Sequence, residues 1–220
     1  MLRRLMMEVE MIEKIRGRLV LLAVGATLCI TVPFVPALPA AAQTSLNVPA
    51  ATYTIDPKHT QIVFGVKHMG LSTFFGRFGY ATGSLIFDPA APEKSALSAQ
   101  IDMNNLTTHW DELDQQLKAS VFHIDKFPNA TFVATQSVKT GPNTGTVTGN
   151  LTIAGVTKPV TLNVTFNGGR NSPIPLQPYR IGFDATGTLR RSDFGLNHAI
   201  WSGMVGDEVT LWIECELEKK

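Results

Sequence analysis

Side chains that could carry chemistry are few in this sequence, and they are scattered. Five histidines occur: His59, His68, His109, His123 and His198. No two are spaced as H-x-x-x-H or H-x-H, the spacings that place two imidazoles on one face of a helix or a strand. Each is more often a hydrogen-bonded surface or loop residue than a metal ligand. We therefore predict no metal site.

Nucleophile and phosphate-binding motifs are missing as well. Gly83 and Ser84 do not complete the pattern G-x-S-x-G, and no glycine-rich loop leads from a strand into a helix. Asp111, Glu112 and Asp114 could be imagined as paired acids, but their helical placement indicates a solvated face. We predict no catalytic residues and no cofactor.

The most polar cluster is R-R-S-D-F-G-L, residues 190–196. Here Asp193 can pair with Arg190 or Arg191 and fix the bend after a strand, while Phe194 is buried. A structural use is favoured over a catalytic one. The letters D-F-G alone, without a kinase catalytic loop, indicate nothing about phosphoryl transfer.

The segment S-T-F-F-G-R-F, residues 72–78, crowds three phenylalanines into what reads as a bend between two strands. Gly76 would permit the bend and Phe78 would enter the second strand. Ordinary packing explains one or two of the rings. Three rings together (Phe74, Phe75 and Phe78) favour an apolar entrance, or threshold, through which an apolar ligand reaches a binding cavity.

Alternation of apolar and polar residues, typical of half-buried strands, dominates from residue 53 onwards. It predicts eight strands joined mostly by short turns, and short connections favour antiparallel neighbours. The alternating apolar sets are Ile62, Phe64, Val66; Leu85, Phe87; Leu97, Ala99, Ile101, Met103; Ala130, Phe132, Ala134; Val147, Gly149, Leu151, Ile153; Val160, Leu162, Val164, Phe166; Ile181, Phe183, Ala185, Leu189; and Val209, Leu211, Ile213, Cys215, Leu217.

Eight antiparallel strands with one apolar face each must hide those faces from water. Closing the sheet into a barrel does so and also removes exposed edges, with a two-sheet sandwich as the alternative. We predict an all-β fold, an eight-stranded antiparallel β-barrel. Small residues on the apolar faces favour an internal cavity over a filled core. They are Ala99, Ala130, Ala134, Gly149 and Ala185.

Two segments break the alternation. Residues 107–118 place Trp110, Leu113 and Leu117 at helical spacing, and Thr108 can cap this helix with Asp111 in its first turn. We expect the short helical insertion to pack over one mouth or flank of the barrel. Residues 168–178, rich in glycine and proline, are predicted to be a loop.

The N-terminal residues have the pattern of a secretory signal peptide. Lys14, Arg16 and Arg18 precede an apolar run at residues 19–30, prolines follow, and A-A-A-Q at residues 40–43 offers a cleavage site. An uncleaved anchor is the alternative, although the run is short for a span of about 20 residues. We predict a signal peptide at residues 1–42, a linker at 43–52 and one domain at 53–220.

Composition limits the partners of that domain. Without residues 1–42 the chain has 14 Lys and Arg against 15 Asp and Glu, so its net charge is close to −1. Nothing in this balance suggests binding to nucleic acid. Only Cys215 remains, so no internal disulfide can form, and we interpret it as a small buried hydrophobe.

Several strings together resemble the YceI-like, polyisoprenoid-binding family. The resemblance begins with Y-T-I-D-P-K-H-T-Q-I-V-F-G-V-K-H-M-G-L-S-T-F-F-G-R-F at residues 53–78 and continues through F-D-P (87–89) and F-P-N-A-T-F (127–132). The long string G-N-L-T-I-A-G-V-T-K-P-V-T-L (149–162) is the most specific. R-S-D-F-G (191–195) and G-D-E-V-T-L (206–211) complete a match over roughly residues 53–218.

The resemblance implies a lipocalin-like barrel exported to the bacterial periplasm, with secretion as the alternative. It also implies a tunnel that holds a polyisoprenoid or an isoprenoid quinone, for transport, storage or sequestration, and no enzymatic activity. Transient contact with a membrane or a membrane protein is compatible with this, and the oligomeric state is left open, with a homodimer as one alternative. The predicted ligand-binding residues are Phe64, Val66, Phe74, Phe75, Phe78, Leu85, Phe87, Ile101, Trp110, Phe122, Phe132, Ile153, Leu162, Phe183 and Ile213.

Two segments depart from the family pattern. The insertion has L-D-Q-Q-L at residues 113–117 where R-D-x-H-L is common, so Leu113 replaces an arginine and Gln116 a histidine. In the second segment, Ala81 stands where a phenylalanine is frequent. The smaller Ala81 would widen the tunnel locally. His68 or Arg77 would meet a head group if they lie near an opening.

Two other functions are compatible with the sequence. One is an enzyme acting on a bound lipid or quinone, with His68, His123 or Asp193 as acid or base. The other is a module that binds a membrane partner such as a cytochrome, in which case the purified protein would carry no lipid.

Overall fold

The computed structural model describes residues 48–197, 201 and 203–220, so the predicted signal peptide lies outside the described residues. The chain divides into two units, Met1–Ala42 and Gln43–Lys220, and every described residue belongs to the second. Strand β1 begins at Ala51, within the segment predicted to be a linker.

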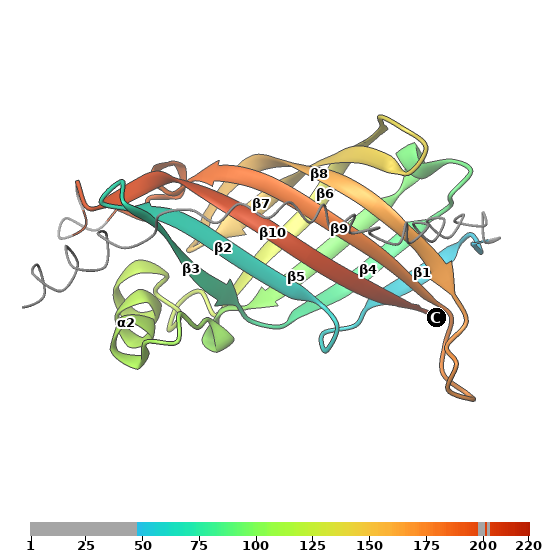
Figure 1. Ribbon diagram of the computed structural model, residues 1–220, viewed down its shortest axis with the longest axis horizontal. Coiled ribbons are helices and arrows are strands. Elements are labelled where there is room, and N and C mark those ends of the chain that lie inside the picture. The colour runs from blue at the N-terminus through green and yellow to red at the C-terminus, as the bar shows by residue number, and fades with distance from the viewer. Residues whose placement is uncertain (1–47, 198–200, 202) are drawn as a thin grey trace, which may run out of the picture. The chain divides into compact units, whose positions relative to one another are not determined.

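The described part of this unit consists mainly of strands, with a short helical insertion between β5 and β6 (Figure 1). The strands are β1 Ala51–Ile55, β2 Gln61–His68, β3 Ser72–Phe78, β4 Ala81–Phe87, β5 Ala96–Asp102, β6 Asn129–Lys139, β7 Thr144–Ile153, β8 Val156–Arg170, β9 Arg180–Arg190 and β10 Val205–Lys219. The helical segments are η1 Pro92–Lys94, η2 Met103–Asn105, α2 Asp111–Gln116, η3 Leu117–Val121 and η4 Arg191–Phe194.

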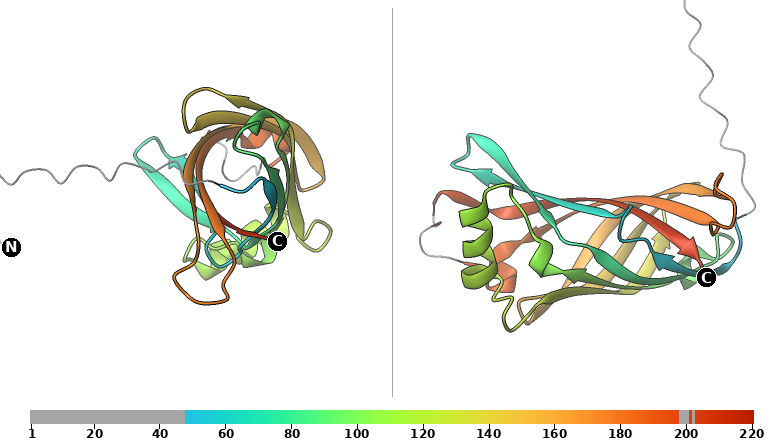
Figure 2. Two further views of the ribbon diagram at one scale, coloured as in Figure 1. Left: turned by 90° about the vertical axis from the view of Figure 1, so that its right-hand side faces the viewer. Right: turned by 90° about the horizontal axis from the view of Figure 1, so that it is seen from below.

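These strands close into an antiparallel ring in the order β1-β4-β5-β6-β7-β8-β9-β10, with β10 returning to β1 (Figure 2). Strands β1 and β2 pair with successive parts of β10, and β4 and β3 pair in turn with β1 and β2. The ten segments therefore make an eight-stranded wall. The predicted all-β, eight-stranded antiparallel barrel is confirmed.

The two ends of the barrel differ. The mouth end, as we call it, carries the β4–β5, β6–β7 and β8–β9 connections; the helix end carries the β2–β3 and β7–β8 turns, the insertion and the β9–β10 connection (Figure 1). The strands alternate as predicted along much of the wall. On β10, for example, Leu211 and Leu217 are buried whereas Trp212 between them is exposed.

Residues 72–78, predicted to be a bend, form strand β3. The segment pairs with β2 along its whole length, from Ser72 opposite His68 to Phe78 opposite Ile62. The chain reverses earlier, at Met69 and Gly70, which both have positive φ. Gly76 therefore does not permit a bend. A Cβ there would lie 2.3 Å from the Phe64 ring, so this glycine makes room for Phe64.

The helical insertion is shorter and capped differently from the prediction. Helix α2 spans Asp111–Gln116 and continues as a π-helix, η3. Thr108 does not cap it with Asp111; instead Asp114 Oδ1 accepts hydrogen bonds from the Thr108 N–H (2.7 Å) and hydroxyl (2.6 Å). Asp114 is buried, which corrects its assignment to a solvated face. No helix among the described residues is long and apolar enough to cross a membrane.

An ion cluster holds the break between β1 and β2 against the wall. Asp56 Oδ2 lies 2.7 Å from Arg180 Nη1 and 2.6 Å from His59 Nδ1, and Arg180 also pairs with Glu216 and Glu218. Burial by itself would raise the pKa of Asp56, but hydrogen bonds from His59, Arg180 and Lys58 outweigh it and lower the pKa to about 2. The carboxylate therefore stabilises the fold at neutral pH.

The polar cluster at residues 190–196 has a structural role, as predicted, but the contacts that it makes differ from the predicted ion pair. Arg191 donates to the carbonyl oxygens of Gly206 (2.9 Å), Leu196 (3.0 Å) and Val205 (3.1 Å), which ties η4 to β10. Within the described residues Asp193 forms no ion pair with Arg190 or Arg191, because the Arg191 guanidinium is used by these backbone oxygens. Phe194 is buried, as predicted.

The predicted loop at residues 168–178 starts later than expected. Strand β8 runs on to Arg170 and still pairs with β9, because a register shift between Phe166 and Gly168 absorbs an extra residue. The connection that remains, residues 171–179, projects from the mouth end (Figures 1 and 2).

Candidate functional site

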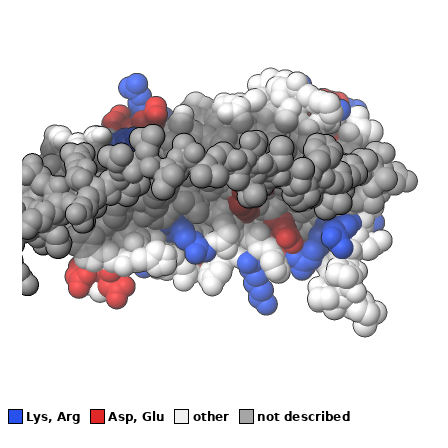
Figure 3. Space-filling view, in the orientation of Figure 1, with Lys and Arg blue, Asp and Glu red and all other residues white. Residues whose placement is uncertain are grey.

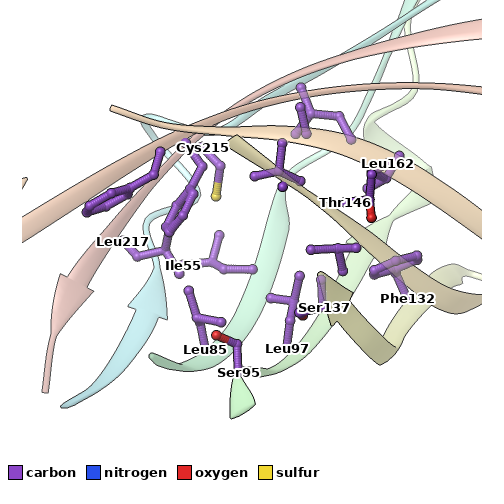
Figure 4. Close-up of a pocket in the computed structure, with 18 of the residues that line it drawn as sticks. Ile55, Leu85, Ser95, Leu97, Phe132, Ser137, Thr146, Leu162, Cys215 and Leu217 are labelled. Atoms are coloured by element: carbon purple, nitrogen blue, oxygen red, sulfur yellow. The ribbon is translucent and has the colours of Figure 1, made fainter. Parts of the chain in front are cut away.

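A cavity of about 660 Å³ lies inside the barrel, and all ten strands contribute to its wall. Leu85, Leu97, Leu162 and Leu217 point inwards from four different strands (Figure 4). The lining is almost wholly apolar. The size falls in the range of about 300–1,000 Å³ that is usual for small-molecule sites.

The polar lining is concentrated at the mouth end. Lys139, Asn143 and Thr144, from the β6–β7 hairpin, are exposed residues that border the cavity. Ser95 precedes β5, and Ser137 faces the interior from β6 (Figure 4). An amphiphile could therefore leave its polar group at this end while its hydrocarbon lies deeper.

The helix end is closed by three aromatic rings, which we call the aromatic plug: Phe64, Phe78 and Phe122. The Phe64 and Phe78 centroids are 4.8 Å apart, and those of Phe78 and Phe122 are 6.0 Å apart in an edge-to-face arrangement. Only Phe78 of the three borders the cavity. Phe78 is thus part of the cavity floor and not of an entrance threshold.

A second aromatic cluster lies in the wall towards the mouth end. The rings of Phe87, Phe166 and Phe183 have centroid separations of 5.0–5.5 Å, and all three border the cavity. Phe87 is the last residue of β4, and Phe166 comes just before the register shift in β8. A hydrocarbon that enters from the mouth end would pass these rings first.

Nine of the fifteen predicted ligand-binding residues border the cavity: Phe78, Leu85, Phe87, Ile101, Phe132, Ile153, Leu162, Phe183 and Ile213. Six do not. They are Phe64, Val66, Phe74, Phe75, Trp110 and Phe122.

The six other residues fail to border the cavity for different structural reasons. Phe64 and Phe122 lie behind Phe78 in the aromatic plug, and Val66 pairs with Phe74 farther towards the helix end. Phe75 is 54% exposed and packs on Trp212, which is itself exposed.

Period 2 places Phe75 on the face opposite Phe74 and Phe78, so the interpretation of three rings at one threshold is wrong in its geometry. Trp110 is likewise exposed.

Register shifts between strands place some residues in the cavity lining that the alternation in the sequence does not predict. Strand β6 has an extra residue between Ala134 and Gln136, so the inward face passes from even to odd positions. Ser137 and Lys139 therefore border the cavity, although no alternation predicted it. Phe166, by contrast, borders the cavity and belongs to an alternating apolar run, so the pattern alone places it on the inward face.

Small residues do enlarge the cavity. Ala99, Ala130 and Ala185 border it, and so does Ala81, the position that departs from the family pattern. Gly149 and Ala134 do not. A Cβ at Gly149 would lie 2.4 Å from the Phe132 ring, so this glycine accommodates a side chain that does line the cavity.

Titratable groups are nearly absent from the cavity wall. Lys139 is the one charged residue among the described residues that border it, and Cys215 is the one thiol. Burial raises the pKa of Cys215, whose sulfur accepts a 3.6 Å hydrogen bond from the Thr60 hydroxyl. His68, His123, Asp193 and Arg77 do not border the cavity, and no group of metal-ligating residues is gathered in the described chain.

Fold and cavity together define a class of protein: antiparallel β-barrels with an apolar interior that is accessible from one end. Residues 53–217 match the model of the YceI-like domain, and the chain belongs to that family. A UPF0312 protein of Pseudomonas paraeruginosa is 37% identical over 183 residues, 82% of this chain and 93% of its own length. A UPF0312 protein of Yersinia enterocolitica is 38% identical over 170 residues, 76% of this chain and 86% of its own.

Solved structures show the same fold. BcnA of Burkholderia cenocepacia has a TM-score of 0.65 at 25% identity, over 74% of this chain and 98% of its own. The Campylobacter jejuni YceI protein has a TM-score of 0.60 at 30% identity, over 70% and 90%. A polyisoprenoid-binding domain of Saccharophagus degradans has a TM-score of 0.59 at 17% identity, over 76% and 98%.

Proposed function

We propose that this protein is an exported carrier or store for a polyisoprenoid or isoprenoid-quinone-like amphiphile. The hydrocarbon lies in the barrel cavity, and the polar group lies at the mouth end. Residues 1–42 direct export to the periplasm and are then removed. No chemistry is performed on the ligand.

The observation that carries this proposal is the nearly continuous apolar lining of a cavity of about 660 Å³. Each CH₂ transferred from water into such a lining contributes roughly 0.8 kcal/mol before ordering costs. Water molecules there would find few of the polar partners that they need. A branched hydrocarbon can therefore bind without a charged contact.

Relatives support the ligand class. The Saccharophagus degradans domain that shares this fold is a polyisoprenoid-binding domain, and this chain belongs to the YceI-like family. The likeness of that domain extends to the fold alone, so the ligand class must be tested on this protein.

The test compares two tryptophan substitutions on adjacent residues of β9. Ala185 borders the cavity whereas Thr186 faces outwards, so Ala185→Trp fills the cavity and Thr186→Trp is its matched control. We expect Ala185→Trp to weaken saturable uptake of an isoprenoid quinone at least ~10-fold, because its ring occupies the volume that the hydrocarbon needs. Thr186→Trp should bind normally, and both variants should keep the β-sheet circular dichroism spectrum.

Native purification followed by organic extraction and mass spectrometry identifies the natural ligand. Recovery of an isoprenoid lipid from the unchanged protein, and less from Ala185→Trp, is the expected result. A protein that neither carries nor takes up such a lipid would contradict the proposal.

A further inference from the structure

The β8–β9 loop, residues 171–179, exposes apolar side chains at the mouth end. Its sequence N-S-P-I-P-L-Q-P-Y contains no charged residue. Ile174 is 61% exposed, and Leu176 is fully exposed. In Figure 3 the protrusion at the lower right, which is this loop, is white throughout.

Leu176 is held in an unfavourable backbone conformation. The Gln177 N–H donates to the Ile174 carbonyl oxygen (3.3 Å), so residues 174–177 form a turn with Pro175 second and Leu176 third. The φ of Leu176 is +67°, which is the sign that a type II turn requires at its third position and that glycine normally supplies. A leucine there costs backbone energy and buries nothing within the described chain.

The loop lies at the rim of the cavity. Gly168, three residues before it, borders the cavity, as does Asn143 of the β6–β7 hairpin. The Phe166 N–H donates to the Asn143 carbonyl oxygen (2.7 Å), which fixes that hairpin beside β8. The exposed Val138 of the same hairpin also borders the cavity.

The charged residues at this end are mainly cationic. The exposed cations are Lys94, Lys139, Arg170, Lys219 and Lys220.

The nearby acids are fewer than these cations, and one of them is paired with an arginine. The Glu218 carboxylate is paired with Arg180, and the Asp88 carboxylate accepts a hydrogen bond from the Ala90 N–H. Glu93 is exposed on η1. The apolar loop therefore lies in a predominantly basic surrounding, which suits a surface of anionic lipid headgroups over an apolar interior.

We propose that the mouth end docks on an anionic lipid bilayer, with Ile174 and Leu176 inserted among the acyl chains. The cations around the mouth then face the headgroups, and the amphiphile passes between bilayer and cavity without crossing water. This inference rests on the proposed function, because it concerns the route by which that ligand enters. The β2–β3 turn at the helix end also exposes Met69 and Leu71, but neither residue borders the cavity.

Depth-sensitive labels test which end meets the bilayer. An environment-sensitive fluorophore is attached at Leu176→Cys or, as the control, at Leu71→Cys, with Cys29 and Cys215 replaced by serine. Vesicles of phosphatidylcholine with 30% phosphatidylglycerol should shift the emission of the label at 176 to the blue and allow quenching by doxyl lipids. The label at 71 should not respond. A response at 71 alone, at both positions or at neither would overturn docking through the mouth end.

Leu176→Gly separates docking from stability and from ligand binding. Because glycine tolerates the positive φ, this variant should unfold at the same or a higher temperature. Its uptake of isoprenoid quinone from the anionic vesicles should be ~10-fold slower, while uptake from an ethanol solution should be unchanged. Equal rates from vesicles for both proteins would overturn the inference. Failure of the unchanged protein to take up quinone by either route would instead contradict the proposed function.

Discussion

Phe75 and Phe78 lie on the same strand, β3, but on opposite faces of the barrel wall. Phe78 borders the cavity and contacts Phe64 and Phe122, whereas Phe75 is half exposed against Trp212. These two phenylalanines, three positions apart, have different surroundings because side chains on a strand alternate between its two faces.

Substituting the two phenylalanines should separate their roles. Phe78→Ala removes a ring of the aromatic plug and should lower the free energy of unfolding by about 3 kcal/mol. Phe75→Ala should lower it by about 1 kcal/mol or less, because the ring is half exposed, and should leave quinone uptake unchanged. Urea unfolding and a binding titration measure both effects. A loss of uptake in Phe75→Ala would contradict this assignment.

Asp56 should make stability depend on acid pH. Its folded pKa of about 2 lies below the ordinary value of 3.8, so its stabilising contribution is present above about pH 4 and is lost as the pH falls towards 2. Asp56→Asn should cost about 2 kcal/mol at pH 7, and the difference from the unchanged protein should shrink between pH 4 and 2. Urea unfolding at several pH values measures this. The exposed Asp125→Asn is the control; a constant difference across that range would refute the assignment.

At the scale of elements, the insertion is fixed to the barrel both by buried side chains, such as Leu106 and Phe122, and by hydrogen bonds. Arg77 and Thr107 exchange backbone hydrogen bonds of 2.8 and 2.9 Å, which attach the start of the insertion to β3. Asp114 then folds the insertion back on itself through Thr108. Burial alone would raise the pKa of Asp114, but the hydrogen bonds from Thr108 outweigh it and lower that pKa.

Removing the Asp114 carboxylate should loosen the insertion without unfolding the barrel. Asp114→Ala leaves the buried Thr108 N–H and hydroxyl without their acceptor, a loss of about 1–3 kcal/mol. Hydrogen exchange of residues 103–128 should become faster, while that of β7, β8 and β9 should not change. Asp111→Ala, on the exposed side of the same helix, is the matched control. Equal effects of the two substitutions would contradict the role of Asp114.

At the scale of the whole molecule, the barrel separates an apolar interior from water, and Cys215 reports on that interior. Its side chain points into the cavity (Figure 4), and burial raises its pKa, so the thiol is protonated at neutral pH. Thiolate, the reactive form, is therefore scarce.

Alkylation of Cys215 should reveal whether the cavity is filled. With N-ethylmaleimide at pH 7, we expect slow modification of the folded protein and a further decrease of at least ~10-fold when isoprenoid quinone is bound. Mass spectrometry of the peptide that contains Cys215 measures the rate, and denaturation in urea is the control that restores full reactivity. No protection by a ligand that does bind would place the hydrocarbon elsewhere.

The sequence by itself predicted eight of the ten strands and favoured a closed barrel over a sandwich, because period-2 patterns and short connections are local properties of the chain. The resemblance of several strings to the YceI-like family also identified the domain. Alternation identified eight of the predicted ligand-binding residues that border the cavity, such as Leu85 and Phe132. Where one strand remains in register with its neighbour, the inward face can be read directly from the chain.

Only the tertiary structure decided where the cavity opens and which aromatic rings close it. Register shifts in β6 and β8 exchange the inward and outward faces, and they depend on pairing between strands that are distant in sequence. Ser137 and Lys139 consequently border the cavity, while Phe64 is buried in the plug. The extended pairing of residues 72–78 was decided in the same way, because a glycine beneath a ring and a glycine at a bend look alike in one sequence.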